Sequence, residues 1–207
     1  MSHLETLNYI QSSLSERFQK KLTGCYYTHK SVATNMFESL LKEEDFVNSP
    51  KIRVCDPFAG DGRLIVWLIE LCIHYNYKKV WEIYLFDINE AGLLEAESKI
   101  SELKHTGVDI DLVIEKGDIF TLENIDEIAA DLVITNPPWA VLKPDARYHK
   151  QLSEGFRQSY IASMKAYDLY LAKNFPISQP KKKFAGWGTN LSRVGLELSH
   201  RILKENG

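Results

Sequence analysis

Residues 51–64 read KIRVCDPFAGDGRL and join three patterns in a short space. Residues 51–56 form a short apolar run that ends in an acid, which is typical of a buried strand. Residues 56–62, DPFAGDG, make a glycine-rich turn, and the apolar stretch Leu64–Tyr75 then predicts a helix. A strand that enters a helix through a tight turn is the repeating unit of α/β folds.

The same alternation continues toward the C-terminus. The patterns predict strands in Glu82–Asp87, in Asp111–Asp118 and within Asp131–Trp139, and helices over Glu90–His105 and Glu123–Ala129. Strands that alternate with helices in this way predict a parallel sheet with helices on both faces.

Helical periodicity also appears on either side of this region. It predicts helices over Leu4–Lys21, Ser31–Lys42 and Leu191–Leu203, while Ala140–Gly188 is expected to be an insertion loop with some helix. A helix that ends near a glycine normally leads into another strand, so we expect the sheet to be truncated before its fifth strand. The expected organisation is an N-terminal helical segment, 1–24, and one incomplete domain, 25–207.

Composition narrows the class of protein. The chain has 207 residues, 44% of them hydrophobic, which predicts one domain with a hydrophobic core. Its net charge is -3 and its pI is near 6.1, so the chain is not expected to bind nucleic-acid phosphates mainly through a basic surface of its own. Cys55 and Cys72 lie in apolar runs and are expected to be buried thiols. Histidine and cysteine spacing predicts no metal site. Without a signal core or a membrane span, the expected location is the cytoplasm.

Polar residues recur where the predicted strands end. They stand in the turn at 56–62, at Asp87, at Asp118 and in the motif NPPW at 136–139. Ligands of an open parallel sheet bind beyond the carboxyl ends of its strands, so these four features are expected on one rim.

The glycine-rich turn matches neither GxGxxG nor a P-loop. Its helix offers free N–H groups to a carboxylate, and Asp56 or Asp61 can receive an ammonium, so an amino-acid tail fits better than a phosphate. Asp87 is expected to accept hydrogen bonds from two ribose hydroxyls, or to cap the N-terminus of the next helix. Asp118 can accept from an adenine amino group, or can be a turn residue.

NPPW carries the most specific chemistry. The prolines fix the backbone, and Asn136 before them is held extended. The Asn136 amide oxygen and the Pro137 carbonyl can then both accept hydrogen bonds from one amino group. These two bonds favour a nitrogen whose lone pair is localised and can attack an electrophilic methyl group, so no charged general base is required. Trp139 offers a flat face for a base taken out of a duplex.

In this order, YYTHKSVATNMF, DPFAGDGRL, FDIN, GDIF and NPPW resemble the gamma-class adenine-N6 DNA methyltransferases of restriction–modification systems. The resemblance implies a Rossmann-like class I methyltransferase fold, S-adenosyl-L-methionine as cofactor and double-stranded DNA with a flipped adenine as substrate. It also implies a linked or separate DNA-recognition domain, which is expected to lie outside residues 1–207.

The resemblance implies the following site residues. The cofactor's methionine part is assigned to Tyr27, Thr28, Asp56, Pro57, Ala59, Gly60 and Asp61, its ribose and adenine to Asp87, Ile88, Asp118 and Ile119, and the target base to Asn136, Pro137 and Trp139, with Asn136 also near the cofactor. Trp139 stands where the family more often has tyrosine.

Three alternatives stay open. Enzymes that methylate RNA guanine N2 or the glutamine of release factors also carry NPP-aromatic loops, although YYTH at 26–29 argues against them. A cofactor-binding module that is inactive without the rest of its protein is the second alternative. A nicotinamide dehydrogenase is disfavoured because GxGxxG is missing.

Overall fold

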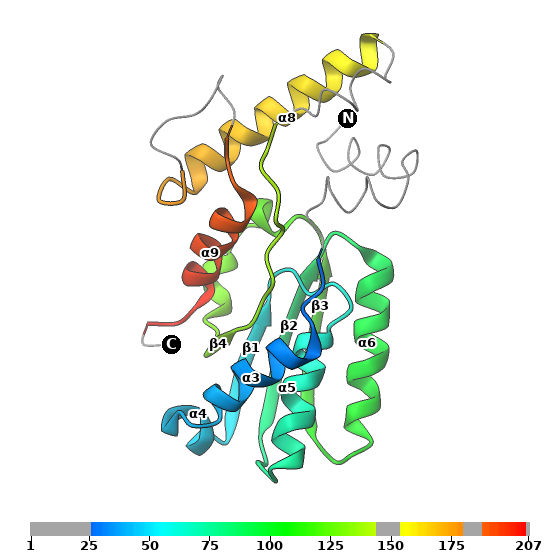
Figure 1. Cartoon of the computed structure of the whole chain (residues 1–207), viewed down its shortest axis with the longest axis vertical. Helices are drawn as coiled ribbons and strands as arrows, with labels where there is room; N and C mark the ends of the chain where they lie inside the picture. Colours follow the sequence, from blue (N-terminus) through cyan, green and yellow to red (C-terminus); the bar gives the residue numbers. More distant parts are fainter. Residues whose placement is uncertain (1–25, 144–153, 180–187, 206–207) are drawn as a thin grey trace. The chain divides into compact units, whose positions relative to one another are not determined.

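The structure is a computed structural model that describes residues 26–143, 154–179 and 188–205 (Figure 1). The chain divides into two compact units. The sheet unit comprises Tyr27–Asn136 with Ser199–Gly207, and the helical unit comprises Met1–Tyr26 with Pro137–Leu198. The predicted helix at Leu4–Lys21, and with it the segment 1–24, lies outside the described residues.

The sheet unit contains four strands in the order β3-β2-β1-β4, all parallel, as predicted. Their bounds are β1 Lys51–Asp56, β2 Val80–Asp87, β3 Asp109–Lys116 and β4 Leu132–Val133. β2 begins at Val80 rather than Glu82, because the register pairs Lys51 of β1 with Val80. β3 likewise begins at Asp109, opposite Val80.

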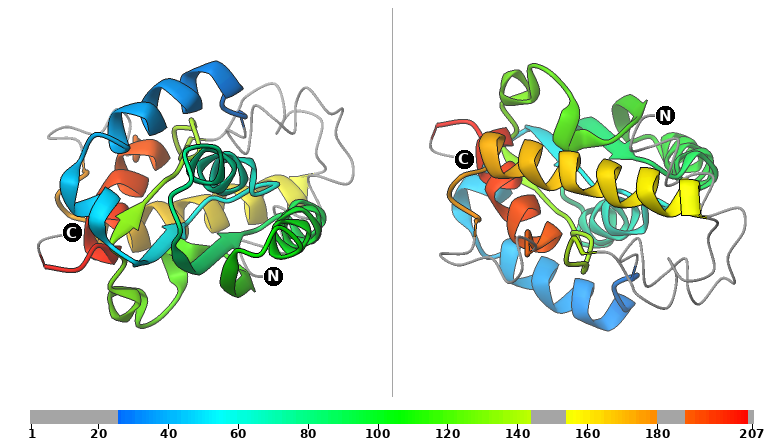
Figure 2. Two further views of the ribbon diagram at one scale, coloured as in Figure 1. Left: turned by 90° about the horizontal axis from the view of Figure 1, so that it is seen from below. Right: turned by 90° about the horizontal axis from the view of Figure 1, so that it is seen from above.

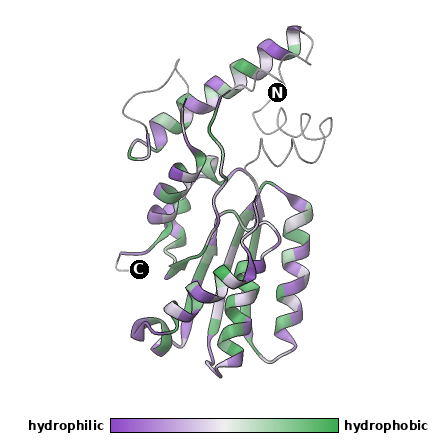
Figure 3. Ribbon diagram, viewed as in Figure 1, coloured by the Kyte–Doolittle hydropathy of each residue, from purple (hydrophilic) through white to green (hydrophobic). Residues whose placement is uncertain are grey.

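Three helices pack together on one face of this sheet. They are α3 Lys30–Leu40, α5 Arg63–His74 and α6 Glu90–Lys104, and they share one buried core with β1 and β2. α3 lies beside α5 (Figure 2), and α5 is apolar along nearly its whole length (Figure 3). The largest fully buried side chains of this core are Trp81, Ile65, Leu68, Ile69, Ile83, Leu85 and Ile100.

The opposite face of the sheet is also apolar. Cys55 alternates with Val54 along β1, so its side chain lies on the other face, and it is fully buried. Cys72 on α5 is buried as well, and both thiols are free, which confirms the prediction for these two cysteines. Burial raises the pKa of both thiols.

Two short 3-10 helices follow β3, η1 Ile119–Thr121 and η2 Ile125–Ile128. η2 occupies the place of the helix predicted over Glu123–Ala129. It stays short because Asn124 and Ala129, which flank it, both take positive φ values of 60° and 45°. The short helix predicted there is therefore present, as a 3-10 helix.

A five-residue helix, α4 Glu44–Asn48, was not predicted. The buried ammonium of Lys79 holds its C-terminal end by donating to the carbonyls of Phe46, Val47 and Ser49. Such a cation satisfies carbonyls that have no partner inside a helix. The sequence does not predict this helix, because five residues are too few to show the 3.6-residue period of apolar positions.

The outer side of the sheet edge at β4 carries one further parallel contact. Ala130 forms an isolated parallel bridge with Leu203, and its N–H and C=O bond to Ile202 and Lys204. The residues after α9 (Leu191–Ile202) thus begin to pair beside β4, in the part of the chain that was expected to lead into a fifth strand.

The helical unit contains α8, Glu154–Asn174, and the first part of α9. α8 takes 21 residues of the region that was expected to be an insertion loop with some helix. The Asn190 side chain caps α9 by accepting from the N–H of Ser192 at 3.0 Å. No helix among the described residues combines the length and the apolar character that a membrane crossing requires.

Candidate functional site

The four predicted rim features fall at one edge of the sheet. Asp56 and Asp87 end β1 and β2, and Asp118 and Asn136 come shortly after β3 and β4. The strands are neighbours and run parallel, so their carboxyl ends meet at the same edge. All four residues belong to the sheet unit.

The glycine-rich turn is tightly enclosed. Gly60 and Gly62 take φ values of 55° and 70°, which favour glycine. A Cβ on Gly62 would lie 2.6 Å from the Cβ of Ala96 on α6, and a Cβ on Gly60 would lie 3.1 Å from Cε1 of Tyr27. The turn therefore packs closely against α6 and Tyr27: there is no room for a side chain at Gly62, and one at Gly60 would require the Tyr27 ring to shift.

Asp87 braces this turn from the next strand. Its carboxylate accepts the backbone N–H of Gly60 at 2.7 Å and that of Asn89 at 2.8 Å. Burial raises the pKa of Asp87, and these N–H groups partly offset that rise. A carboxylate can accept about four hydrogen bonds, so bracing the turn is compatible with the predicted binding of a ribose.

Asp56 is the buried acid of the site. One oxygen, Oδ1, accepts the N–H of Phe58 at 3.1 Å. Neither Asp56 Oδ2 nor Thr135 Oγ1 completes a hydrogen bond within the described part of the chain, although Thr135 lies near enough to lower the pKa of Asp56. Burial dominates and raises that pKa to about 7. A buried carboxylate oxygen that lacks a hydrogen-bond partner in the described chain favours a positively charged donor from a ligand.

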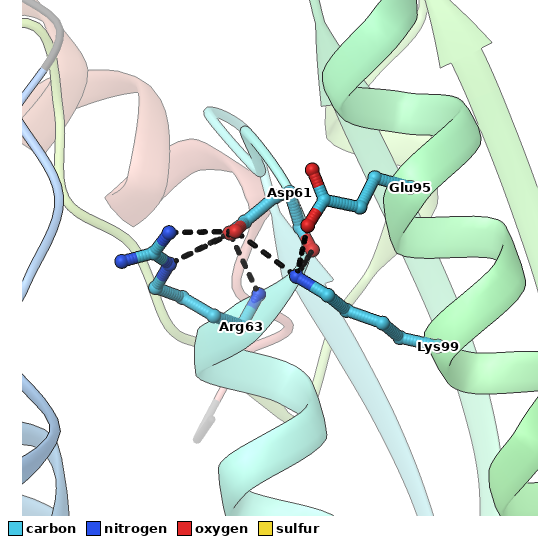
Figure 4. Close-up of polar contacts among 4 residues, drawn as sticks. All are labelled: Asp61, Arg63, Glu95 and Lys99. Carbon is cyan, nitrogen blue, oxygen red and sulfur yellow. Dashed lines mark hydrogen bonds and ion pairs between the residues drawn. The ribbon is translucent and has the colours of Figure 1, made fainter.

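Asp61, the other acid of the turn, is already neutralised (Figure 4). Arg63 donates to both its oxygens, with Nε 2.8 Å from Oδ1 and Nη2 2.7 Å from Oδ2, and Lys99 Nζ lies 3.0 Å from Oδ2. Burial would raise the pKa of Asp61, but the two cations outweigh it and lower the pKa to about 2. Of the two acids considered for an ammonium, the geometry favours Asp56.

The residues after β3 form a small apolar wall. Asp118 Oδ1 accepts the N–H of Phe120 at 3.2 Å, so this acid caps η1. Ile119 and Phe120 are buried, and the rings of Phe120 and Phe58 lie 5.3 Å apart. The turn and the end of β3 are thus joined by apolar contact.

The remaining predicted site residues differ in exposure. Pro57, Ala59 and Pro137 are buried, whereas Thr28, Ile88 and Asn136 are half-buried. Trp139 is 61% exposed, which is unusual for so large an apolar side chain. Asn136 closes the sheet unit, and Pro137 and Trp139 open the helical unit. No group of three or more histidine, cysteine or acidic side chains among the described residues is arranged to hold a metal ion.

Sequence reasoning missed three residues around the site: Thr135, Arg63 and Lys99. Thr135 directly precedes the NPPW motif and Arg63 directly follows the turn, so both stood beside recognised features. Lys99 is 38 positions from Asp61, and only the packing of α6 against the turn brings the two together.

The chain matches known proteins at three levels. The family model "N-6 DNA Methylase" matches residues 8–172. A type II methyltransferase, M.VspI of Vibrio sp. (strain 343), is 32% identical over 143 residues, which are 69% of this chain and 32% of that protein. M.BanIII of Aneurinibacillus aneurinilyticus is 28% identical over 132 residues, which are 58% of this chain and 23% of that protein.

The fold has a counterpart among solved structures. A putative class I S-adenosylmethionine-dependent methyltransferase of Listeria monocytogenes matches with a TM-score of 0.53 at 13% identity, over 99% of this chain and 51% of that one. The chain spans about a third or less of the length of the two curated relatives it matches. It has the class I methyltransferase fold and belongs to the N-6 DNA methylase family.

Proposed function

We propose that the whole protein transfers a methyl group from S-adenosylmethionine to N6 of adenine in double-stranded DNA, as the modification enzyme of a restriction–modification system. Family membership and the two type II methyltransferases support this proposal. The observation that carries it is the buried Asp56 carboxylate, which stands beside the glycine-rich turn on the same sheet edge as Asp87 and Asn136.

The residues at this edge fit the cofactor in charge and in shape. Asp56 Oδ2, buried and without a hydrogen-bond partner in the described chain, suits an ammonium group. Gly60 lets the backbone come close to a ligand, and Asp87 retains acceptor lone pairs for two hydroxyls. Asp118 and Ile119 are assigned to the adenine ring, with Ile88 on its other side. Bound there, the cofactor supplies an electrophilic methyl group.

Asn136 and Pro137 are assigned to the target amine. The lone pair of an aromatic amine is delocalised into its ring, so the amine is a poor nucleophile. The Asn136 amide oxygen and the Pro137 carbonyl accept its two hydrogens, which favours a pyramidal nitrogen that is aimed at the methyl group. Trp139, which is largely exposed, stacks on the flipped adenine.

The test is the rate of methyl transfer by an Asn136→Ala variant of the whole protein. We expect the rate to be abolished and the affinity for S-adenosylmethionine to stay within a few-fold, because Asn136 holds the base and not the cofactor. Asn174→Ala is the matched control, since Asn174 is exposed on α8 and bonds only to the Tyr170 carbonyl among the contacts described. A normal rate for Asn136→Ala contradicts the assignment.

A second candidate function is that of a cofactor-binding module that needs the rest of its protein. The short span relative to M.VspI and the net charge of -3 favour it, because a chain that holds DNA alone usually needs a basic surface. A DNA-recognition domain, linked or separate, would then supply the contacts to DNA. Binding of S-adenosylmethionine by this chain without turnover, and turnover once the rest of the protein is added, distinguishes this module from a chain that is active alone.

The cysteines bear on where the protein acts. Free buried thiols at Cys55 and Cys72 are in keeping with action in the cytoplasm.

A further inference from the structure

Arg63 and Tyr27 form a close contact at the glycine-rich turn. The guanidinium carbon of Arg63 lies 3.9 Å from the centroid of the Tyr27 ring, well inside the range of a cation–π interaction. The same ring stands over Gly60, where its Cε1 is 3.1 Å from the place that a Cβ would take. The ring therefore contacts both the cation and the turn.

The placement of Tyr27 depends on side-chain contacts, and its contact with Arg63 is one of them. It belongs to a segment without regular structure that precedes α3, and its side chain is 47% exposed. An exposed ring on such a segment ordinarily samples several rotamers, and ordering it has an entropic cost. A rigid group that packs on the ring reduces this cost before any ligand arrives.

Arg63 is such a group because it is held at its other end. It donates to both oxygens of Asp61, an acid that is only 4% exposed. Lys99 donates to the same carboxylate and pairs with Glu95 at 2.8 Å, which ties the arrangement to α6 (Figure 4). A planar guanidinium in a two-pronged bond with a carboxylate has a fixed orientation.

The charges of this cluster also suit a cationic ligand. Arg63 and Lys99 are balanced by Asp61 and Glu95, so the four groups carry no net charge. Arg63 can therefore pack against the wall of a site for a positively charged ligand with little repulsion.

We propose that Arg63 is a positioning residue: anchored on Asp61, it holds the Tyr27 ring against Gly60 as one wall of the S-adenosylmethionine site. This inference rests on the proposed function, and it changes the role of Asp61 from a ligand-binding acid to an anchor. The expected consequence is a loss of cofactor affinity when either Arg63 or Tyr27 is altered, with the two losses sharing one cause.

The first test is calorimetric titration of S-adenosylmethionine into the intact chain and its variants. Arg63→Gln and Tyr27→Leu should each raise Kd about threefold to tenfold, which corresponds to one cation–π contact, whereas Tyr27→Phe should stay within about twofold because it keeps the ring. The double variant Arg63→Gln with Tyr27→Leu should bind about as well as Tyr27→Leu alone.

Arg53→Gln is the matched control. Arg53 also donates to an acid, Glu82, at 2.8 Å and also lies over a tyrosine ring, Tyr84, at 5.9 Å, within the same unit but on β1 before the turn. Its loss should lower thermal stability and leave Kd unchanged.

The second test needs no cofactor. In protein labelled with 3-fluorotyrosine, the fluorine resonance of Tyr27 is the one that disappears in Tyr27→Phe. Arg63→Gln should shift that resonance, and Arg53→Gln should not. An unshifted resonance, an unchanged Kd in Arg63→Gln, or fully additive losses in the double variant overturns the inference and leaves the proposed function standing. Failure of the whole protein, as well as of this chain, to bind S-adenosylmethionine overturns both.

Discussion

The carboxylate of Asp87, at the end of β2, accepts the backbone N–H of Gly60, in the turn after β1, at 2.7 Å. Two neighbouring strands are therefore linked at their carboxyl ends by a side chain as well as by the sheet. The turn is shaped before a ligand arrives, which reduces the ordering cost of binding.

Replacing Asp87 separates its two proposed tasks. Asp87→Ala should weaken S-adenosylmethionine binding by about 1–3 kcal/mol, because a charge-assisted acceptor is lost, and should also lower the free energy of unfolding, because the Gly60 N–H loses its partner. Asp87→Asn keeps one oxygen that can accept an N–H, so its cofactor affinity and its free energy of unfolding should lie between those of the unaltered chain and Asp87→Ala. Calorimetric titration and urea unfolding measure the two effects. Unchanged affinity in Asp87→Ala means that the ribose binds elsewhere.

Cofactor affinity should depend on pH through Asp56. Burial raises the pKa of its carboxyl to about 7, and only the ionised form attracts an ammonium. The Kd should therefore fall about five- to tenfold between pH 6.0 and pH 7.5, a range in which most of the ligand's amino group stays protonated. Titration at several pH values measures this. In Asp56→Asn the affinity should be weaker and nearly independent of pH; a variant that keeps the pH dependence contradicts the role of Asp56.

The same residue makes a prediction about stability. The pKa of Asp56 is higher in the folded chain than its ordinary value of 3.8, so between about pH 4 and pH 7 the folded state binds more protons than the unfolded state. The contribution of Asp56 to stability therefore falls as pH rises through this window. Asp56→Asn should be more stable than the unaltered chain at pH 8, by on the order of 1–3 kcal/mol, and equal to it near pH 4. Urea unfolding at both pH values is the measurement.

The parallel sheet and its polar edge were predictable because they rest on local patterns. Apolar runs that end in Asp56, Asp87 and Asp118, and the NPPW motif, each announce a strand end within a few residues. The neutralisation of Asp61 is only partly local: Arg63 is two positions away, but Lys99 comes from α6 and reaches the turn only after the helix has packed. An acid beside a glycine-rich turn is predicted to bind the ligand, whereas in the structure Asp61 is held in ion pairs with Arg63 and Lys99.

The helix α8 shows a different limit of the sequence. Tyr160, Met164, Tyr167 and Leu171 are buried and recur at helical spacing, so a signal existed. The buried Asp168 interrupts the apolar face, and its carboxylate accepts the N–H of Thr189 at 3.3 Å. The interruption makes the helical period harder to recognise in this stretch, which was expected to be part of an insertion loop with some helix.

The turn should tolerate no side chain at Gly62. Gly62→Ala places a methyl group 2.6 Å from the Cβ of Ala96 at a φ of 70°, so both a clash and backbone strain follow. The expected loss of unfolding free energy is about 2–4 kcal/mol. Urea denaturation measures the loss, and a change below about 1 kcal/mol contradicts the close packing described.

Two further variants divide that loss into its parts. Gly107→Ala has a similar φ of 84° but no atom within 4 Å of the new Cβ, so it should show the strain alone, about 1 kcal/mol. Ala96→Gly in the Gly62→Ala background removes the closest contact and leaves the Cα of residue 96 at 3.1 Å, so it should recover part of the stability relative to Gly62→Ala, after correction for the cost of a glycine within α6.

Trp139 should matter for the base and not for the cofactor. Its side chain is 61% exposed, and stacking on a base contributes about 1–3 kcal/mol, so Trp139→Ala should weaken capture of the target base by roughly that amount in the KM for DNA of the whole protein. Trp139→Phe keeps an aromatic face and should retain most of the capture. Tyr75→Ala is the matched control, because Tyr75 is 50% exposed but follows the C-terminal end of α5, away from the turn at its start. Equal losses of DNA and cofactor affinity in Trp139→Ala would place Trp139 in the cofactor site instead of the base site.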